Sequence, residues 1–405
     1  MQRMVVTLTV FMWGVALSST GQAQVLSPRI APLAEDQWTV NVRSGISGFG
    51  VTAQSVTNLH RTLARHPAAL HGLGPLNTYL MGQSMVAAVD QLLMGLRVAW
   101  LCRSPLLWAT LASEARLMGI NEDELQRVTT GPETGWGNWD STLLRAVDEI
   151  YRDSYLSDRS WADFSQRYDA QQLMDVVFTV SEFIMLSMVS NSLGVQPEGT
   201  VLDRLPESIE GVGTLTPTTS VRRKELRLVP ISQEVWPDEV RAITDFNGAD
   251  GEMPNFYGVF AQHPRLLHSF FVQSAHVTMG STLSARDRDL VILRTGWLCR
   301  SEYEWSRHVR VSRQRGLTET EIRSVAIGPG ASGWTPFEVT LLRATDELWG
   351  ENTISDETWN ELEMHYNPIQ LIDLVISIAS TRMVSAAVNS FGVELESGWE
   401  AFPVL

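Results

Sequence analysis

The chain has 405 residues and a formal net charge of −15, with 44% hydrophobic and 19% charged residues. This composition is typical of a globular protein and excludes a disordered one. Because the chain is acidic and its basic clusters are short, we expect it to bind neither nucleic acid nor anionic membranes.

The N-terminal residues predict export. Arg3 precedes an apolar run at 5–17, and Gly21 and Ala23 occupy the small-residue positions of a signal-peptidase site. The run is shorter than the roughly 20 residues that a membrane span needs. We therefore expect residues 1–23 to be a signal peptide and the mature protein to be secreted or periplasmic. An uncleaved membrane anchor is the alternative, and no later segment is expected to cross a membrane.

The remainder of the chain repeats itself at an offset of 197 or 198 residues. The pentapeptide Trp-Leu-Cys-Arg-Ser at 100–104 recurs letter for letter at 297–301, and many further positions match at this offset. The repeat predicts two tandem domains at 28–197 and 226–397, each long enough to bury its own core. Residues 198–225 are rich in Pro, Gly, Thr and Ser and are expected to form a linker. Further matches are His66-Pro67 with His263-Pro264, Thr142-Leu143-Leu144-Arg145-Ala146 with Thr340-Leu341-Leu342-Arg343-Ala344, and Asn191-Ser192 with Asn389-Ser390.

The second copy shows helix signals along its length. Apolar residues recur mainly at helical spacing, and Ser, Thr or Asn stands at the expected helix starts. Sustained alternation typical of strands is absent from the sequence, so we predict that both domains are all-α. Expected helices run from 284 to 298, from 301 to 315 before Gly316, from 318, from 335, from 355 or 356, and from 367 to 389.

The two cysteines stand at matched positions of the repeat. Cys102 and Cys299 both belong to the shared pentapeptide, and neither is part of a Cys-x-x-Cys motif. We interpret them as small buried hydrophobic residues. A disulfide between them is the alternative, and it would require the two domains to bring them together.

A carboxylate and an imidazole follow the second pentapeptide. Glu304 and His308 are four residues apart on one expected helix, so they share a face. A carboxylate in this position can orient an imidazole and raise its basicity, which suits proton transfer near neutral pH. Structural alternatives are a capping box between Ser301 and Glu304 and an ion pair on a solvated face. The first copy has Leu107 and Leu111 instead, so the helix itself does not need the polar pair.

Four neighbouring residues are candidates for substrate binding. Ser301 could donate a hydrogen bond, and His276 precedes the pair by one helix. Trp305 matches Trp108 and is expected in the core or a pocket wall. Arg294 could hold a substrate carboxylate or form a structural salt bridge.

A metal site is a further alternative at the same place. Glu304, His308 and Asp289 could supply three ligands. Because no further His or Cys lies at ligand spacing, we expect neither a metal nor another cofactor.

One stretch of the second copy carries a family resemblance. It comprises the run from Leu283 to Arg294, the segment Glu302-Tyr303-Glu304-Trp305, His308 and Gly316-Leu317. This stretch resembles the carboxymuconolactone decarboxylase family, which includes the alkyl-hydroperoxidase-D-like proteins. The resemblance implies two tandem alkyl-hydroperoxidase-D-like helical domains and an oligomer, often a trimer or hexamer. Two fused copies could replace a homodimer, so three chains could mimic a hexamer.

The resemblance also implies roles for individual residues. Its hydroperoxidase branch uses a Cys-x-x-Cys before a His, but Ser301 and Glu304 stand at the two cysteine positions here. Without either thiol, a disulfide-based peroxidase cycle has no nucleophile. The decarboxylase-like branch keeps the Glu and the His, which implies His308 as general acid/base and Glu304 as its partner. Asp289 stands where the family has an upstream glutamate and would be a supporting carboxylate.

These observations lead to three hypotheses. The first is an exported, cofactor-independent lyase that acts on a small carboxylate or lactone by proton transfer with loss of CO2. The second is a non-catalytic helical module that assembles or binds a ligand. The third, and weakest, is a peroxidase. On the first hypothesis there is one candidate site per chain, and the first domain is degenerate and kept for packing.

Overall fold

A computed structural model describes residues 27–52, 55–133, 135–198, 204–206, 226–246 and 253–403. The predicted signal peptide at 1–23 and most of the predicted linker lie outside the described residues. Below, the first half means residues 27–198 and the second half means residues 226–403. All regular elements among the described residues are helical, so the prediction of an all-α fold is confirmed.

The two halves contain helices in the same order and of similar length. In the first half these are a 3-10 turn at Glu35–Gln37, α1 (Val40–Gly48), α2 (Asn58–Leu63), α3 (Pro67–Gly82), α4 (Ala88–Leu101), α5 (Pro105–Leu117), α6 (Glu122–Val128), α7 (Asn138–Asp153), α8 (Asp158–Ser165) and α9 (Ala170–Leu193). In the second half they are a 3-10 turn at Gln233–Val235, α10 (Asp238–Phe246), α11 (Asn255–Phe260), α12 (Pro264–Ala275), the π-helical turn η4 (His276–Gly280), α13 (Ala285–Leu298), α14 (Glu302–Gln314), α15 (Glu319–Ile327), α16 (Pro336–Glu351), α17 (Asp356–Glu363) and α18 (Pro368–Phe391). Helices α13 to α18, for which starts were predicted, begin within about two residues of those starts.

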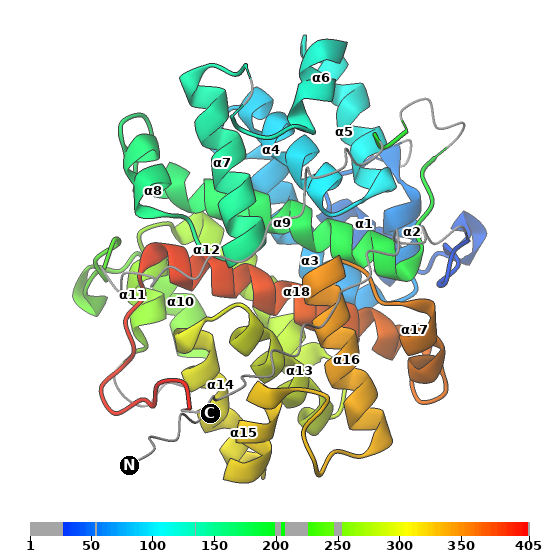
Figure 1. The fold of residues 1–405 in the computed structure, drawn as a ribbon, viewed down its shortest axis with the longest axis vertical. Coiled ribbons are helices and arrows are strands. Elements are labelled where there is room, and N and C mark those ends of the chain that lie inside the picture. Colours follow the sequence, from blue (N-terminus) through cyan, green and yellow to red (C-terminus); the bar gives the residue numbers. More distant parts are fainter. Residues whose placement is uncertain are drawn as a thin grey trace, which may run out of the picture.

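Two long helices form the centre of the molecule. Figure 1 shows α9 in green and α18 in red side by side across the middle, with α4 to α8 on one side and α13 to α17 on the other. Helices α3 and α12 pack against each other in the same central region. The halves therefore meet along their longest and most buried helices.

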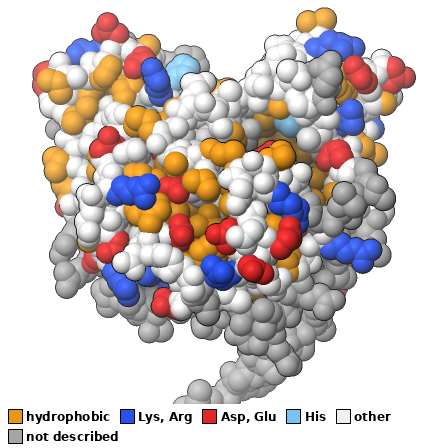
Figure 2. Space-filling view, turned by 90° about the horizontal axis from the view of Figure 1, so that it is seen from above, with side chains coloured by type: hydrophobic (Ala, Val, Ile, Leu, Met, Phe, Trp, Pro, Cys, Tyr) orange, Lys and Arg blue, Asp and Glu red, His pale blue; other side chains and the backbone are white. Residues whose placement is uncertain are grey.

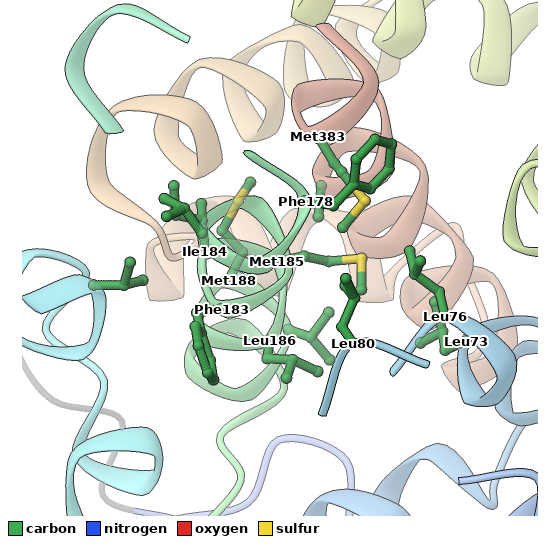
Figure 3. Packing of buried hydrophobic residues seen from close by; sticks show 14 of the residues in the cluster. Leu73, Leu76, Leu80, Phe178, Phe183, Ile184, Met185, Leu186, Met188 and Met383 are labelled. Carbon is green, nitrogen blue, oxygen red and sulfur yellow. The ribbon is translucent and has the colours of Figure 1, made fainter. Parts of the chain in front are cut away.

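The main hydrophobic core runs through both halves. Its largest buried cluster contains side chains from α3, α9, α12 and α18, and Figure 3 shows Phe178 and Met185 of α9 close to Met383 of α18. Flexible thioethers fill irregular gaps where two long helices meet. A smaller, separate cluster surrounds Trp305 in the second half. Each half thus depends on the other for burial of its central helix, whereas the domain boundaries at 197 and 226 remain predictions.

The two central helices explain a mistaken expectation about membrane spans. By length and composition both α9 and α18 could cross a membrane, although no later segment was expected to qualify. In both helices the most apolar stretch of 18 residues is completely buried inside the molecule. Core helices that are surrounded on all sides by protein are apolar all round, so their composition follows from packing.

The face of the molecule drawn in Figure 2 carries acidic, basic and hydrophobic side chains in alternation. No broad field of one charge sign is visible on that face. Such interspersed charges provide little long-range attraction for a polyanion.

The repeated pentapeptide forms the same tight junction in both halves. Its arginine adopts the left-handed backbone region, with φ of 51° at Arg103 and 52° at Arg300. An asparagine from the last helix of the same half closes each junction: the side-chain amides of Asn191 and Asn389 donate to the carbonyl of the junction cysteine at 2.9 and 3.1 Å. The repeated pentapeptide therefore forms a turn between two helices, which the asparagine side chain caps.

Both cysteines are buried within these junctions. Neither forms a disulfide, and Cys102 and Cys299 are almost completely inaccessible to solvent. Burial is the largest influence on the Cys102 thiol and raises its pKa to about 12. The interpretation as small buried hydrophobic residues is confirmed, and the disulfide alternative is wrong.

Candidate functional site

A small pocket of about 40 Å³ opens among α12, η4, α13, α14 and α18. Its charged side chains and its imidazole come from α14, which contributes Glu304, Arg307 and His308, and hydroxyl groups come from other helices. Apolar walls come from Phe270, Ile292 and other residues of the surrounding helices. The pocket thus combines two opposite charges and an imidazole with a largely apolar lining.

The Glu304–His308 pair lies in this pocket. The His308 Nε2 atom is 3.3 Å from Glu304 Oε2, which agrees with the four-residue spacing on one helix face. The Glu304 side chain is 3% exposed and that of His308 is 12% exposed. A pair on a solvated face would be open to water, so this structural alternative is wrong.

The helix start differs from the expected capping box. Ser301 is the N-cap residue of α14, but its side chain makes no capping hydrogen bond. Its hydroxyl is buried and has no hydrogen-bond partner within the described part of the chain. Glu304 directs its carboxylate to His308 instead of back to the Ser301 backbone.

The pocket keeps Glu304 ionised at neutral pH. Burial raises the pKa of Glu304, but the hydrogen bond and charge of His308 and the charge of Arg307 together outweigh burial, so the pKa lies below its ordinary value. The second carboxylate oxygen, Oε1, is buried without a hydrogen-bond partner among the described residues. An acceptor left unpaired costs about 1–3 kcal/mol, which a donor on a ligand could recover.

Arg307 is a pocket residue that the sequence analysis missed. Burial lowers the pKa of Arg307, but the combined interactions with neighbouring acidic and phenolic groups raise it by more. The net shift is upward, so the guanidinium stays charged. The groups that raise the pKa are Glu304, Tyr257, Tyr303 and Glu396. Its Cζ atom lies 5.6 Å from the ring of Phe256. Comparison of the two copies could have identified Arg307, because the matching position of the first half, Thr110, carries no charge.

Residues 266–347 match the family model described as the carboxymuconolactone decarboxylase family. This segment belongs to the carboxymuconolactone decarboxylase family. The match extends from α12 into α16 and contains Glu304, Arg307 and His308. The predicted family is therefore confirmed for residues 266–347, which supply all of the pocket lining except the residues of α18. No curated protein matches the chain.

Asp289 does not join the family pocket. It is completely buried in α13, where Oδ1 accepts a 2.7 Å hydrogen bond from Arg315 at the end of α14. Neither a hydrogen bond nor an ion pair connects it with Glu304 or His308 in the described chain. Asp289 lies one turn before the pocket residue Ile292, and its ion pair with Arg315 connects α13 with the end of α14.

Arg294 has a structural role in the family domain. Its Nε and Nη2 atoms bond Asp346 at 2.6 and 2.9 Å, and Nη1 bonds two carbonyls of α15 at 3.0 and 2.8 Å. Arg97 makes the matching contacts in the first half, with Asp148 at 2.8 and 3.1 Å. Gly328 has φ of +100°, and a Cβ there would lie 2.6 Å from Arg294. Arg294 therefore forms the structural salt bridge that the sequence analysis gave as the alternative, and its role in substrate binding stays a prediction.

Trp305 and His276 also lie outside the pocket lining. Trp305 packs against Trp297 and Phe402, with ring centroids 5.4 and 5.8 Å away. The His276 Nε2 atom lies 2.8 Å from Asp373 Oδ1, although the next two residues of η4 do line the pocket. The structure therefore brings together Glu304 and His308 of the predicted residues, and adds Arg307.

The matching place in the first half is apolar. Leu107 and Leu111 occupy the positions of Glu304 and His308, and both are buried. A Cβ at Gly95 would come within 2.8 Å of Leu111 and 2.9 Å of Phe183, so these side chains fill the space closely. This half offers no counterpart to the polar pair at that place.

Metal-ligand geometry is not found at the candidate pocket. Glu304, His308 and Asp289 do not form a group of converging ligand atoms among the described residues. Asp289 is engaged by Arg315, which removes the third ligand considered from the sequence.

Proposed function

We propose that the protein is an exported enzyme of the carboxymuconolactone decarboxylase type, a lyase whose reaction uses no cofactor. Its substrate would be a small carboxylate or lactone that loses CO2. The observation that carries this proposal is the contact between Glu304 and His308 in a pocket that also holds Arg307. The family assignment of residues 266–347 supports it.

The three side chains suit three parts of such a reaction. When the bond between a carbon and its carboxylate breaks, CO2 leaves and the electron pair moves toward the lactone carbonyl. His308 then delivers a proton to that carbon and recovers one from water. The ionised Glu304 would hold the imidazole of His308 in position for this transfer, because the two side chains lie 3.3 Å apart. Arg307 offers a fixed positive charge to a second carboxylate or to the developing oxyanion.

The size of the pocket restricts what can enter. At about 40 Å³ it is much smaller than a cavity of roughly 150 Å³ that holds a benzene ring. We infer that a small reacting end of the substrate enters the pocket and that any larger part stays outside or displaces the lining side chains.

Replacement of His308 tests the proposal directly. His308→Ala and His308→Gln should each reduce CO2 release from muconolactone-like acids by about 10²–10⁴-fold, because the proton donor is lost. Arg307→Thr, which installs the residue of the first half, should mainly raise KM. Circular dichroism and thermal melting should show that all three variants remain folded. Turnover unchanged in both His308 variants would refute the assignment.

A ligand-binding module without catalysis is the second candidate function. A larger pocket of about 170 Å³ lies where the halves meet, and Tyr79, His263 and Arg265 are among its lining residues. If the protein binds small acids at this pocket but the His308 variants lose nothing, the non-catalytic function is favoured. A peroxidase lacks support, because Ser301 and Glu304 replace the two thiols and Cys299 is buried.

Assembly and location remain separate proposals. We expect a homo-oligomer, with a trimer favoured because three double-domain chains would present six domains. Light scattering coupled to gel filtration would measure the mass, and a clean monomer would refute this. Cleavage after Ala23 on expression in a secreting host, read by mass spectrometry, tests the export signal.

A further inference from the structure

A second cluster of polar side chains lies between the halves, outside the candidate pocket. It comprises His66, which precedes α3, His276 in η4 and Asp373 in α18. The two His Nε2 atoms lie 2.9 and 2.8 Å from Asp373 Oδ1. All three side chains are buried, and their three ligand atoms lie within 4.8 Å of one another.

We propose that His66, His276 and Asp373 bind a divalent transition-metal ion such as Zn²⁺, which ties the two halves together. Two neutral imidazoles and one carboxylate are a common donor set for Zn²⁺ and similar ions. Ligand atoms that share one tetrahedral ion at about 2.0–2.2 Å lie about 3.3–3.6 Å apart. The nitrogen–oxygen distances of 2.9 and 2.8 Å here are about half an ångström shorter, so the two imidazoles would move slightly away from Asp373 when an ion enters. Each imidazole would bind through Nε2 with its proton on Nδ1, and three protein ligands leave a position for water.

A matched cluster around Asp175, made of Tyr79 and Asp175 from the first half and His263 from the second, joins the halves by hydrogen bonds. His263 Nε2 lies 3.0 Å from Asp175 Oδ1, and the Tyr79 hydroxyl lies 2.9 Å from the same oxygen and 2.8 Å from His263 Nε2. This cluster joins the halves with a single imidazole. A hydrogen-bonded connection between the halves therefore does not need a second imidazole. In the cluster around Asp373, His276 supplies this second imidazole and with it the third metal ligand.

The surroundings of Asp373 orient it as a ligand. Its Oδ2 accepts hydrogen bonds of 2.6 and 2.7 Å from the backbone amide and hydroxyl of Thr282. These contacts leave Oδ1 directed to the two imidazoles. Supporting hydrogen bonds of this kind fix the geometry of metal-ligating carboxylates in proteins.

Local backbone features also favour His276 as a ligand. It begins a π-helical turn, a form of helix that is frequent at functional sites. Gly72 of α3 faces it so closely that a Cβ there would lie 2.8 Å from His276 Cβ. The corresponding position of the second half, 269, holds Ser. Gly72 thus allows α3 to approach the His276 side chain closely.

Metal content of the purified full chain tests the proposal. After incubation with ZnSO4 and desalting, mass spectrometry of the metals should find about one zinc ion per chain, and a chelator should lower the melting temperature. His276→Tyr copies the first half and should reduce bound zinc to the level of the buffer. Asp373→Asn, which changes shape little, should do the same.

Two further variants sharpen this test. Tyr79→His adds an imidazole to the first cluster and should raise the content to about two ions per chain. The double variant Glu304→Leu with His308→Leu should still hold one ion, because the candidate pocket is a separate site. The proposal is overturned if the unmodified protein holds no zinc, if His276→Tyr retains it, if Tyr79→His gains none, or if the pocket variant loses it.

Discussion

The two halves share a framework and differ at one place in it. Matched contacts hold the pentapeptide junctions and the buried arginines in both halves, at an offset of 197 or 198 residues. At the start of α14, however, Glu304 and His308 face a pocket, whereas Leu107 and Leu111 fill the same place in the first half. What recurs in both halves is needed for folding, and what occurs in one half is available for function.

The buried arginines should show the largest effect on stability. Arg97→Ala and Arg294→Ala each leave a carboxylate and helix carbonyls without their partner, which should cost about 3–5 kcal/mol of unfolding free energy. Asp346 is more exposed than Asp148, so we expect the smaller loss for Arg294→Ala. Urea denaturation measures both. A large loss for one arginine and none for the other would show that the shared framework is not equally important in the two halves.

Glu304 should give the second half an acid-sensitive contribution that the first half lacks. Its folded-state pKa is lowered, so its stabilisation is complete above the unfolded value of about 4.3 and is lost as pH falls through the folded pKa. Stability measured from pH 7 to pH 3 should therefore fall less steeply in Glu304→Gln than in the unmodified protein. Leu107→Ala in the first half serves as a control with an unchanged slope. Parallel curves for Glu304→Gln and the unmodified protein would contradict the proposed charge state.

The junction asparagines should produce the smallest effect. Asn191→Ala and Asn389→Ala each remove a cap on a cysteine carbonyl, and each should cost about 1 kcal/mol. The two values should agree within about 0.5 kcal/mol, because the junctions have the same geometry. Thermal melting is the measurement. A loss of stability in only one of the two variants would indicate that the matched asparagines do not have the same structural role.

Local signals made much of the second half predictable from sequence. Thr318 with Glu321 and Thr335 with Glu338 form capping boxes, and the helices begin where these residues predict. Such interactions join residues three apart, so the sequence alone specifies them. The shared position of Glu304 and His308 on one face was predictable for the same reason.

Long-range contacts escaped prediction. The partner of Arg294 is 52 residues away, and His66 meets Asp373 at a separation of 307 residues. Sequence periodicity places a side chain on a face of its helix but does not determine which distant helix covers that face. For this reason Asp289 and Arg294 were assigned to the site, whereas Arg307 was overlooked. The capping box at Ser301 failed for a local reason, because Glu304 contacts His308 one turn further along the same helix instead.

Conversion of the second half to the first tests the central claim most directly. The double variant Glu304→Leu with His308→Leu should fold, because the matching leucines pack well in the first half. Its melting temperature should stay close to that of the unmodified protein while CO2 release from muconolactone-like acids disappears. If the folded double variant turns over such substrates as fast as the unmodified protein, the pair is not the catalytic centre.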